Sequence, residues 1–142
     1  MAQHWLYPVN DAKKDKQLSD GKLEIPRTPD GVREAFRRTP TNQWILGTAF
    51  RQVKRGDRLW IYVCHPRQEI TAVANVVHDP TQEANGTWSV RLQLDWAVSN
   101  YLVDHPIART AFRQVPYSVT RANPATVKLL THCERTARTA PT

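Results

Sequence analysis

Hydrophobic and polar residues alternate over short segments of this chain, and the pattern predicts a strand-rich domain. The segment 69–77 is β-branched and apolar throughout, which is typical of a strand with both faces covered. By contrast, 87–96 alternates strictly between apolar and polar residues, which places Trp88, Val90, Leu92, Leu94 and Trp96 on one face. Strands are predicted at 4–9, 58–64, 69–77, 87–96 and 116–120.

Helix start signals occur at two places in the sequence. Thr28 can cap a short amphipathic helix that begins at Pro29, with its arginines (Arg33, Arg37 and Arg38) predicted to face solvent. Asn123 and Pro124 predict the start of a last helix, followed by a flexible tail at 134–142. A further helical turn or two is predicted around 43–50, before a turn at 54–57.

Together these elements predict one α+β domain at 1–133. We expect a small curved sheet or barrel of five to six mostly antiparallel strands, flanked by two to three short helices. The sequence contains no 18-residue apolar run and no secretory segment, so a cytoplasmic protein is expected. Its two cysteines, Cys64 and Cys133, show no metal-binding spacing and are expected to be reduced.

The charge of the chain changes this picture by suggesting a partner. The formal net charge is +7, and cations that neutralise phosphates supply most non-specific affinity for nucleic acid. An anionic surface or an acidic protein would satisfy the same charge, so a protein-interaction domain stays an alternative.

Signals for catalysis are sparse in the sequence. The five histidines are scattered, and no metalloprotease, nucleophile-elbow or phosphate-loop motif is present. His78 and Asp79 are adjacent and could form an acid–base pair in a nuclease or deaminase, although a plain turn before Pro80 also explains them. A non-enzymatic binding protein without metal or cofactor is therefore expected.

Aromatic residues give a stronger indication of binding. The chain has five tryptophans, and the predicted core face of 87–96 explains only two of them. Trp5, Trp44 and Trp60 either pack in the core or form the walls of a slot for a planar ring. Stacking of a base on such a wall contributes about 1–3 kcal/mol.

The order of several short motifs resembles the EVE domain, a relative of the YTH readers in the PUA-like superfold. The resemblance covers about residues 3–131 and rests on "HWLYPVN", an isolated Trp44, "KRGDRLWIYV", "ITAVANVVHDP" and "FRQVPYSVTRANPATVKLL". It implies a PUA-like β-barrel with an aromatic pocket for a modified base. One departure is that Pro8 and Val9 stand where the family usually has Lys-Ser.

Residue roles follow from the resemblance by position. Trp44 corresponds to the cage tryptophan, and Asn10 to the polar group that bonds the edge of the base. Weaker candidates for the pocket wall are Trp5 and Tyr62. The family gives no firm role to Trp60, which stays a candidate because of its ring, and Asp79 could make the edge contact that rejects thymine in place of Asn10. The cations expected to hold the nucleic-acid backbone are Arg51, Lys54, Arg55, Arg37, Arg38 and Arg67.

The function implied by the resemblance is a reader of modified bases. We expect it to flip 5-methylcytosine or 5-hydroxymethylcytosine out of double-stranded DNA, at a cost of a few kcal/mol. The alternative is an RNA-binding module for a modified nucleotide. In a restriction-type system, a partner nuclease would do the cutting.

Overall fold

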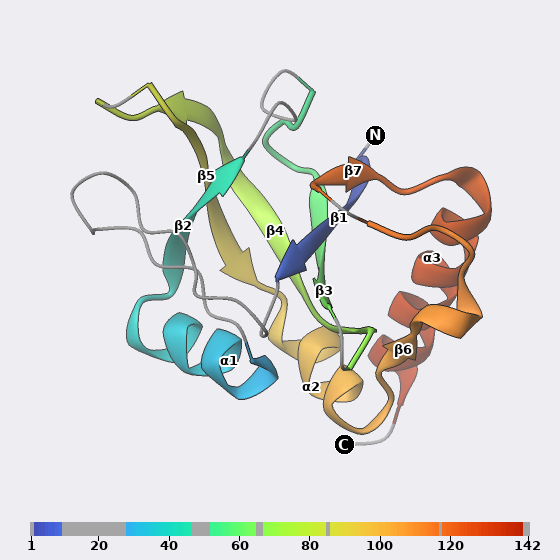
Figure 1. Cartoon of the computed structure of the whole chain (residues 1–142). Helices are drawn as coiled ribbons and strands as arrows, with labels where there is room; N and C mark the ends of the chain where they lie inside the picture. Colours follow the sequence, from blue (N-terminus) through green and yellow to red (C-terminus); the bar gives the residue numbers. More distant parts are fainter. Residues whose placement is uncertain are drawn as a thin grey trace.

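The computed structural model describes residues 2–9, 28–46, 52–64, 67–84, 86–116 and 118–140. Its centre is a seven-stranded mixed sheet, and six strands follow the order β2-β5-β4-β3-β1-β7 while β6 pairs with β4 (Figure 1). Strands β1 and β3 are parallel and the other pairs are antiparallel. Along the described residues this path has two ends, so the sheet is open. The strands are β1 (His4–Val9), β2 (Thr41–Leu46), β3 (Arg58–Val63), β4 (Glu69–Gln82), β5 (Trp88–Leu94), β6 (Ile107–Ala108) and β7 (Thr120–Arg121).

Among the described residues three α-helices flank the sheet, and each begins with a side-chain cap. The caps are Thr28 for α1 (Pro29–Arg38), Asp95 for α2 (Trp96–Asp104) and Asn123 for α3 (Pro124–Thr139). Helices α1 and α2 lie below the sheet in Figure 1, and α3 lies on the right beside a short 3-10 helix, η2 (Arg109–Ala111).

Both faces of the central strands are buried, against different layers. In β3, Leu59, Ile61 and Val63 belong to one core cluster, which includes residues of β2, β5 and α1. Trp60 and Tyr62 point to the opposite face and join a second cluster with residues of α2 and α3. The two large rings of β3 are therefore explained by packing, because a second layer of helices covers their face of the sheet.

The predicted α+β class, with a mostly antiparallel sheet and flanking helices, is confirmed. Three local predictions are wrong. Residues 41–46 form strand β2 where the sequence predicted helical turns around 43–50, of which 47–50 lie outside the described residues. Trp96 starts α2 and is not the end of a strand, because Asp95 accepts a hydrogen bond from the Val98 N–H. The closing strand lies at 120–121, later than the predicted 116–120.

The predicted flexible tail is also corrected, since α3 continues to Thr139. Glu134 pairs with the buried Arg58 at 2.5 Å, and Arg138 pairs with Asp95 at 2.6 Å. Burial alone would raise the pKa of Asp95, but hydrogen bonds from Val98 and Arg58 lower it below its ordinary value. These ion pairs fasten the last turns of α3 to the sheet and to the start of α2.

Removing residues 134–142 will therefore destabilise the fold. A chain ending at Cys133 removes Glu134 from Arg58, which keeps Asp95, and uncovers the surface beneath the buried Ala137, so we expect a loss of about 1–3 kcal/mol in the free energy of unfolding. Urea denaturation measures this change. A chain ending at Ala140 serves as the control, and equal stability of the two shortened chains would contradict the role of the last helical turns.

His4 makes the stability depend on pH. Its Nδ1 accepts a 3.0 Å hydrogen bond from the Trp60 indole, and burial, with help from the Arg58 charge, lowers the pKa of His4 against the opposing effect of Glu134. Because the pKa of His4 is lowered in the folded state, the contribution of neutral His4 to the free energy of unfolding is fully present above the unfolded pKa of about 6.5. This contribution is lost as the pH falls through the folded pKa. Denaturation at several pH values will show a smaller loss in acid for His4→Gln than for the parent chain, and an equal loss would refute the assignment.

Candidate functional site

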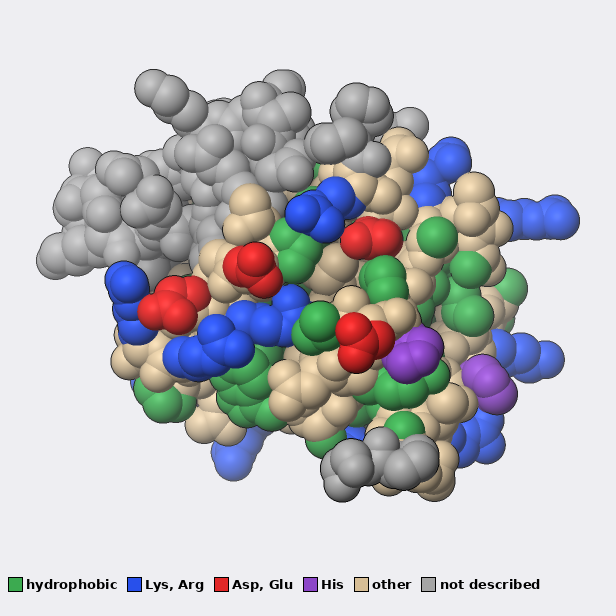
Figure 2. All heavy atoms as spheres, turned by 90° about the horizontal axis from the view of Figure 1, so that it is seen from below, with side chains coloured by type: hydrophobic (Ala, Val, Ile, Leu, Met, Phe, Trp, Pro, Cys, Tyr) green, Lys and Arg blue, Asp and Glu red, His purple; other side chains and the backbone are tan. Residues whose placement is uncertain are grey.

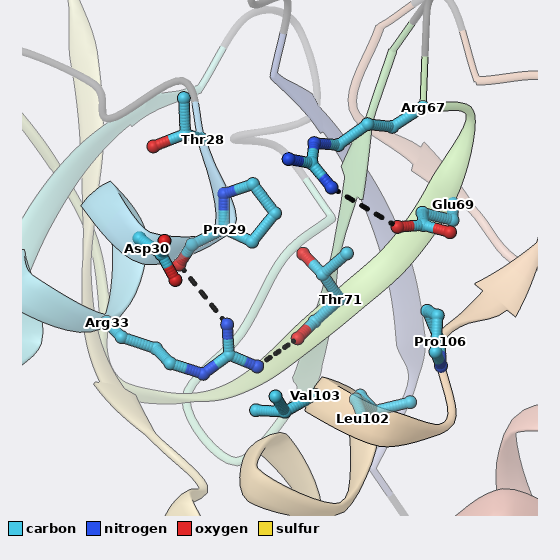
Figure 3. A pocket seen from close by; sticks show the side chains of 10 residues that line it. All are labelled: Thr28, Pro29, Asp30, Arg33, Arg67, Glu69, Thr71, Leu102, Val103 and Pro106. Atoms are coloured by element: carbon cyan, nitrogen blue, oxygen red, sulfur yellow. Dashed lines mark hydrogen bonds and ion pairs between the residues drawn. The ribbon is translucent and has the colours of Figure 1, made fainter.

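A pocket of about 210 Å³ opens between the start of α1, the start of β4 and the end of α2 (Figure 3). It lies at the end of the sheet where β3 ends, because Val63 pairs with Glu69. A larger groove of about 600 Å³ runs between α2 and α3, but none of the buried polar atoms without a partner lines it. The residues around the smaller pocket are Thr28, Pro29, Asp30, Arg33, Arg67, Glu69, Thr71, Leu102, Val103 and Pro106.

Arg33 fixes the base of this pocket. It is 6% exposed, and its Nη2 donates to the backbone carbonyls of Thr71 and Ser99, both at 2.9 Å. Its Nη1 donates to the Pro29 carbonyl at 3.3 Å. One guanidinium thus joins α1, β4 and α2, which corrects the prediction that Arg33 faces solvent.

Thr71 supplies a polar group without a partner. The residue is 3% exposed, and its Oγ1 makes no hydrogen bond. Figure 3 shows this hydroxyl directed into the space between Pro29 and Arg67, while the Thr71 carbonyl accepts from Arg33. A buried hydroxyl without a partner costs about 1–3 kcal/mol, so a ligand that bonds it would remove that cost.

The remaining walls divide into a polar and an apolar part. Arg67 and Glu69 form a loose ion pair of 3.9 Å on the side of β4, and Glu69 is the less exposed of the two. Pro29 lies across from them on α1, and Leu102, Val103 and Pro106 lie at the end of α2. Two acids and two arginines line the pocket, so their formal charges balance. The lining therefore suits a small neutral ring with a hydrogen-bonding edge better than a free phosphate.

The structure places the predicted aromatic pocket residues in the core. Trp44 is 0% exposed in strand β2, between Tyr7 and Phe36 at ring distances of 5.1 and 5.9 Å. Its expected place at a helix start is therefore wrong. Trp5 is equally buried, and its indole N–H donates to Asp57 at 2.9 Å.

Trp60 and Tyr62 lie on the other side of the sheet, in the second core cluster. Burial raises the pKa of Tyr62, and its ring packs edge-on against Phe112 at 6.1 Å. These four rings do not come together around one cavity among the described residues. In this conformation none of the four rings offers an open face to a base, because each is at most 2% exposed.

The predicted polar and basic residues are also spread over the molecule. Asn10 and Arg51 lie outside the described residues. Lys54 and Arg55 form the turn before β3, and the exposed Asp79 accepts a 2.8 Å hydrogen bond from the Arg55 N–H. Strand β3 separates this turn from the pocket by about 17 Å. The turn itself is as predicted, with the Asp57 N–H donating to the Lys54 carbonyl at 3.0 Å.

Of the other three cations, one lies at the pocket and two lie away from it. Arg67 is on its rim, whereas Arg37 and Arg38 are exposed at the far end of α1 and both approach Glu34. The Arg37 guanidinium also lies 5.6 Å from the centre of the Trp96 ring. The five described members of the expected backbone-binding set therefore lie in three separate places.

Sequence reasoning missed Arg33, Glu69 and Thr71. Arg33 follows Pro29 by four residues and lies one helical turn away from it, but nothing local shows that the turn is buried. Thr71 stands in an apolar run with both faces covered, where a hydroxyl is unexpected, and that is a usable signal.

Metal sites and membrane-spanning helices each have a pattern with which the described residues can be compared. No group of three or more His, Cys, Asp or Glu side chains in the described ranges is arranged to hold a metal ion. His78 is exposed, and its Nδ1 lies 2.7 Å from the Asp79 carbonyl. Of the helices in the part of the chain that the structure covers, none is long and apolar enough to cross a membrane.

Comparison with known proteins supports the fold. No family model matches the sequence, and no curated protein sequence matches it. The NMR structure of protein Rpa0253 from Rhodopseudomonas palustris is similar with a TM-score of 0.59 at 15% identity, covering 99% of this chain and 97% of that chain. The crystal structure of protein Atu2648 from Agrobacterium tumefaciens gives 0.54 at 13% identity, covering 94% and 92%.

An ASCH protein from Zymomonas mobilis is a more distant neighbour, with a TM-score of 0.46 at 12% identity, covering 92% of this chain and 94% of that chain. At these identities the first two similarities establish the fold alone, and the third adds no argument. The fold is a small α+β fold of the PUA-like barrel type with flanking helices, whose sheet stays open along the described strands.

Replacing Trp44 separates a core role from a binding role. Trp44→Ala will cost about 3–5 kcal/mol of stability, because it empties a fully buried site. Trp44→Phe will cost much less, since it keeps a ring and removes an indole N–H that has no partner. Thermal or urea denaturation measures both. A folded Trp44→Phe chain that loses nucleic-acid binding would restore Trp44 as a cage residue.

Proposed function

We propose that this chain is a nucleic-acid-binding protein that holds one flipped base in the pocket between α1, β4 and α2. The base is 5-methylcytosine or 5-hydroxymethylcytosine in DNA, and the protein itself catalyses no reaction. The observation that carries the proposal is the Thr71 hydroxyl, which is buried without a partner and directed into the pocket. The size of the pocket supports one ring, since sites for drug-sized ligands are usually larger than about 300 Å³.

The polar wall matches the edge of cytosine. Its exocyclic amine donates two hydrogen bonds, and carboxylates are the usual acceptors for this amine. Glu69 is such an acceptor, and Arg67 and the Thr71 hydroxyl are donors for the ring nitrogen and the carbonyl oxygen. Thymine has a carbonyl oxygen in place of the amine, so Glu69 would face a second acceptor and disfavour it.

The apolar wall accounts for a preference for a methylated base. Pro29 packs on the ring, and Leu102, Val103 and Pro106 supply apolar surface for the substituent. Burial of one methyl group contributes about 0.8 kcal/mol, which is roughly fourfold in affinity. Discrimination between methylated and unmodified cytosine is therefore expected to be modest unless the methyl group fits closely.

The whole-chain properties support nucleic acid as the source of the base. The net charge of +7 favours a polyanion, and the motif order resembles the EVE domain, whose relatives read modified bases. The PUA-like fold is compatible with this family, and EVE membership is part of the proposal. In a restriction-type system, a partner nuclease would cut the DNA that this protein marks.

The proposal is tested by competition binding at fixed salt concentration. One duplex carries cytosine, 5-methylcytosine or 5-hydroxymethylcytosine at the same position, and a single-stranded RNA carries the same set. The modified duplex will bind most tightly of the set. Glu69→Gln will weaken binding of this duplex about tenfold, and Thr71→Val will weaken it about two- to tenfold.

Asp104→Asn is the matched control for Glu69→Gln, because it removes the same charge from an exposed site on another side of α2. Equal binding of all duplexes, or equal effects of both substitutions, would refute the base pocket. Tighter binding of the modified RNA would assign the site to RNA, and a product that disappears in His78→Ala would show an enzyme instead.

A further inference from the structure

Three residue pairs connect α1 with α2, and their order runs in opposite directions along the two helices; we call this line of pairs the seam. Pro29 and Leu102 line the pocket together, and Arg33 donates to the Ser99 carbonyl. Further along, Arg37 stacks on Trp96. The α1 members follow at intervals of four residues and the α2 members at intervals of three, so each set occupies one side of its helix. The seam begins at the pocket and ends about 12 Å away at Arg37.

Arg37 is held in a defined position at this far end. Its guanidinium lies over the Trp96 ring at 5.6 Å, and Glu34 lies 3.8 Å from its Nη1. The Arg37 side chain is 59% exposed, while Trp96 is half-buried against the first core cluster. A planar guanidinium stacked on an aromatic face keeps donors free at its edge, and it loses little freedom when it binds an anion.

The charge distribution indicates what the seam receives. The pocket itself has balanced charges, so it has no preference for a phosphate. On the face seen from below, Lys and Arg side chains are interspersed with acidic and hydrophobic side chains and form no continuous basic field (Figure 2). A nucleic-acid strand whose base enters the pocket would therefore be bound by individual cations. Arg37 is the cation at the far end of the seam.

We propose that the α1–α2 seam carries the nucleic-acid strand next to the bound base, and that Arg37, positioned by Trp96, binds a phosphate of that strand. This inference rests on the proposed function. Arginine is suited to the contact because its paired N–H groups match two phosphate oxygens. Trp96 does not itself contact the strand. It is a positioning residue that keeps the guanidinium in place.

The test compares two probes on the intact protein, 5-methyl-2′-deoxycytidine alone and a short single-stranded DNA with this nucleoside at its centre. Arg37→Gln will weaken binding of the oligonucleotide about tenfold and leave binding of the nucleoside unchanged. It will also reduce the slope of log affinity against log salt by about 0.7, the value for one lost phosphate contact on a single strand. Lys128→Gln is the control, because it removes an equal charge from the exposed side of α3.

Substitutions of Trp96 test the positioning role. Trp96→Phe keeps a ring beneath Arg37 and will retain affinity for the oligonucleotide. Trp96→Leu removes the ring and will lose about as much oligonucleotide affinity as Arg37→Gln does. An Arg37→Gln effect no larger than that of Lys128→Gln would overturn the seam and leave the pocket standing. Absence of nucleoside binding together with an intact Arg37→Gln effect would overturn the pocket, and with it the strand beside a bound base, and would leave only a phosphate contact at Arg37. Absence of binding to both probes would overturn both the pocket and the seam.

Discussion

The arrangement of this protein around its pocket depends on one buried arginine. The Arg33 guanidinium donates to carbonyl oxygens of α1, β4 and α2, and two of these bonds are 2.9 Å long. Carbonyl groups carry no net charge, so the guanidinium is stabilised here by dipoles in place of an ion pair. Burial removes water from Arg33 and lowers the pKa of Arg33 from its ordinary value. The spacing between the two helices, and hence the width of the pocket, is set by this contact.

The same two-sided burial that stabilises the sheet decides which aromatic residues are free to bind. Each face of the curved sheet is covered by its own core cluster, and both clusters contain large rings, as Trp44 and Trp60 show. Trp96 differs because it lies at a helix start on the edge of the core. The polar groups of the candidate pocket lie instead where helix ends meet the sheet, with Glu69 and Thr71 at the start of β4.

Elements with local signals were predictable from the sequence, and those that depend on distant partners were not. Thr28 with Pro29 and Asn123 with Pro124 mark helix starts by their own chemistry, and both helices were found. The burial of Arg33 depends on carbonyls 38 and 66 residues away, and the last turns of α3 depend on Arg58 and Asp95. The candidate pocket was missed for the same reason, since its walls come from three separate segments.

Strand β1 lies between β3 and β7, in parallel with the first and antiparallel to the second. Its partners are separated from it by more than 50 and more than 110 residues, as in Trp5 with Leu59 and with Arg121. Such non-local pairing slows folding, because long loops must close before the contacts form. Because β1 precedes both partners in the sequence, it is among the last of the described strands to be completed, and its edge is open to other chains until residues 120–121 pair with it.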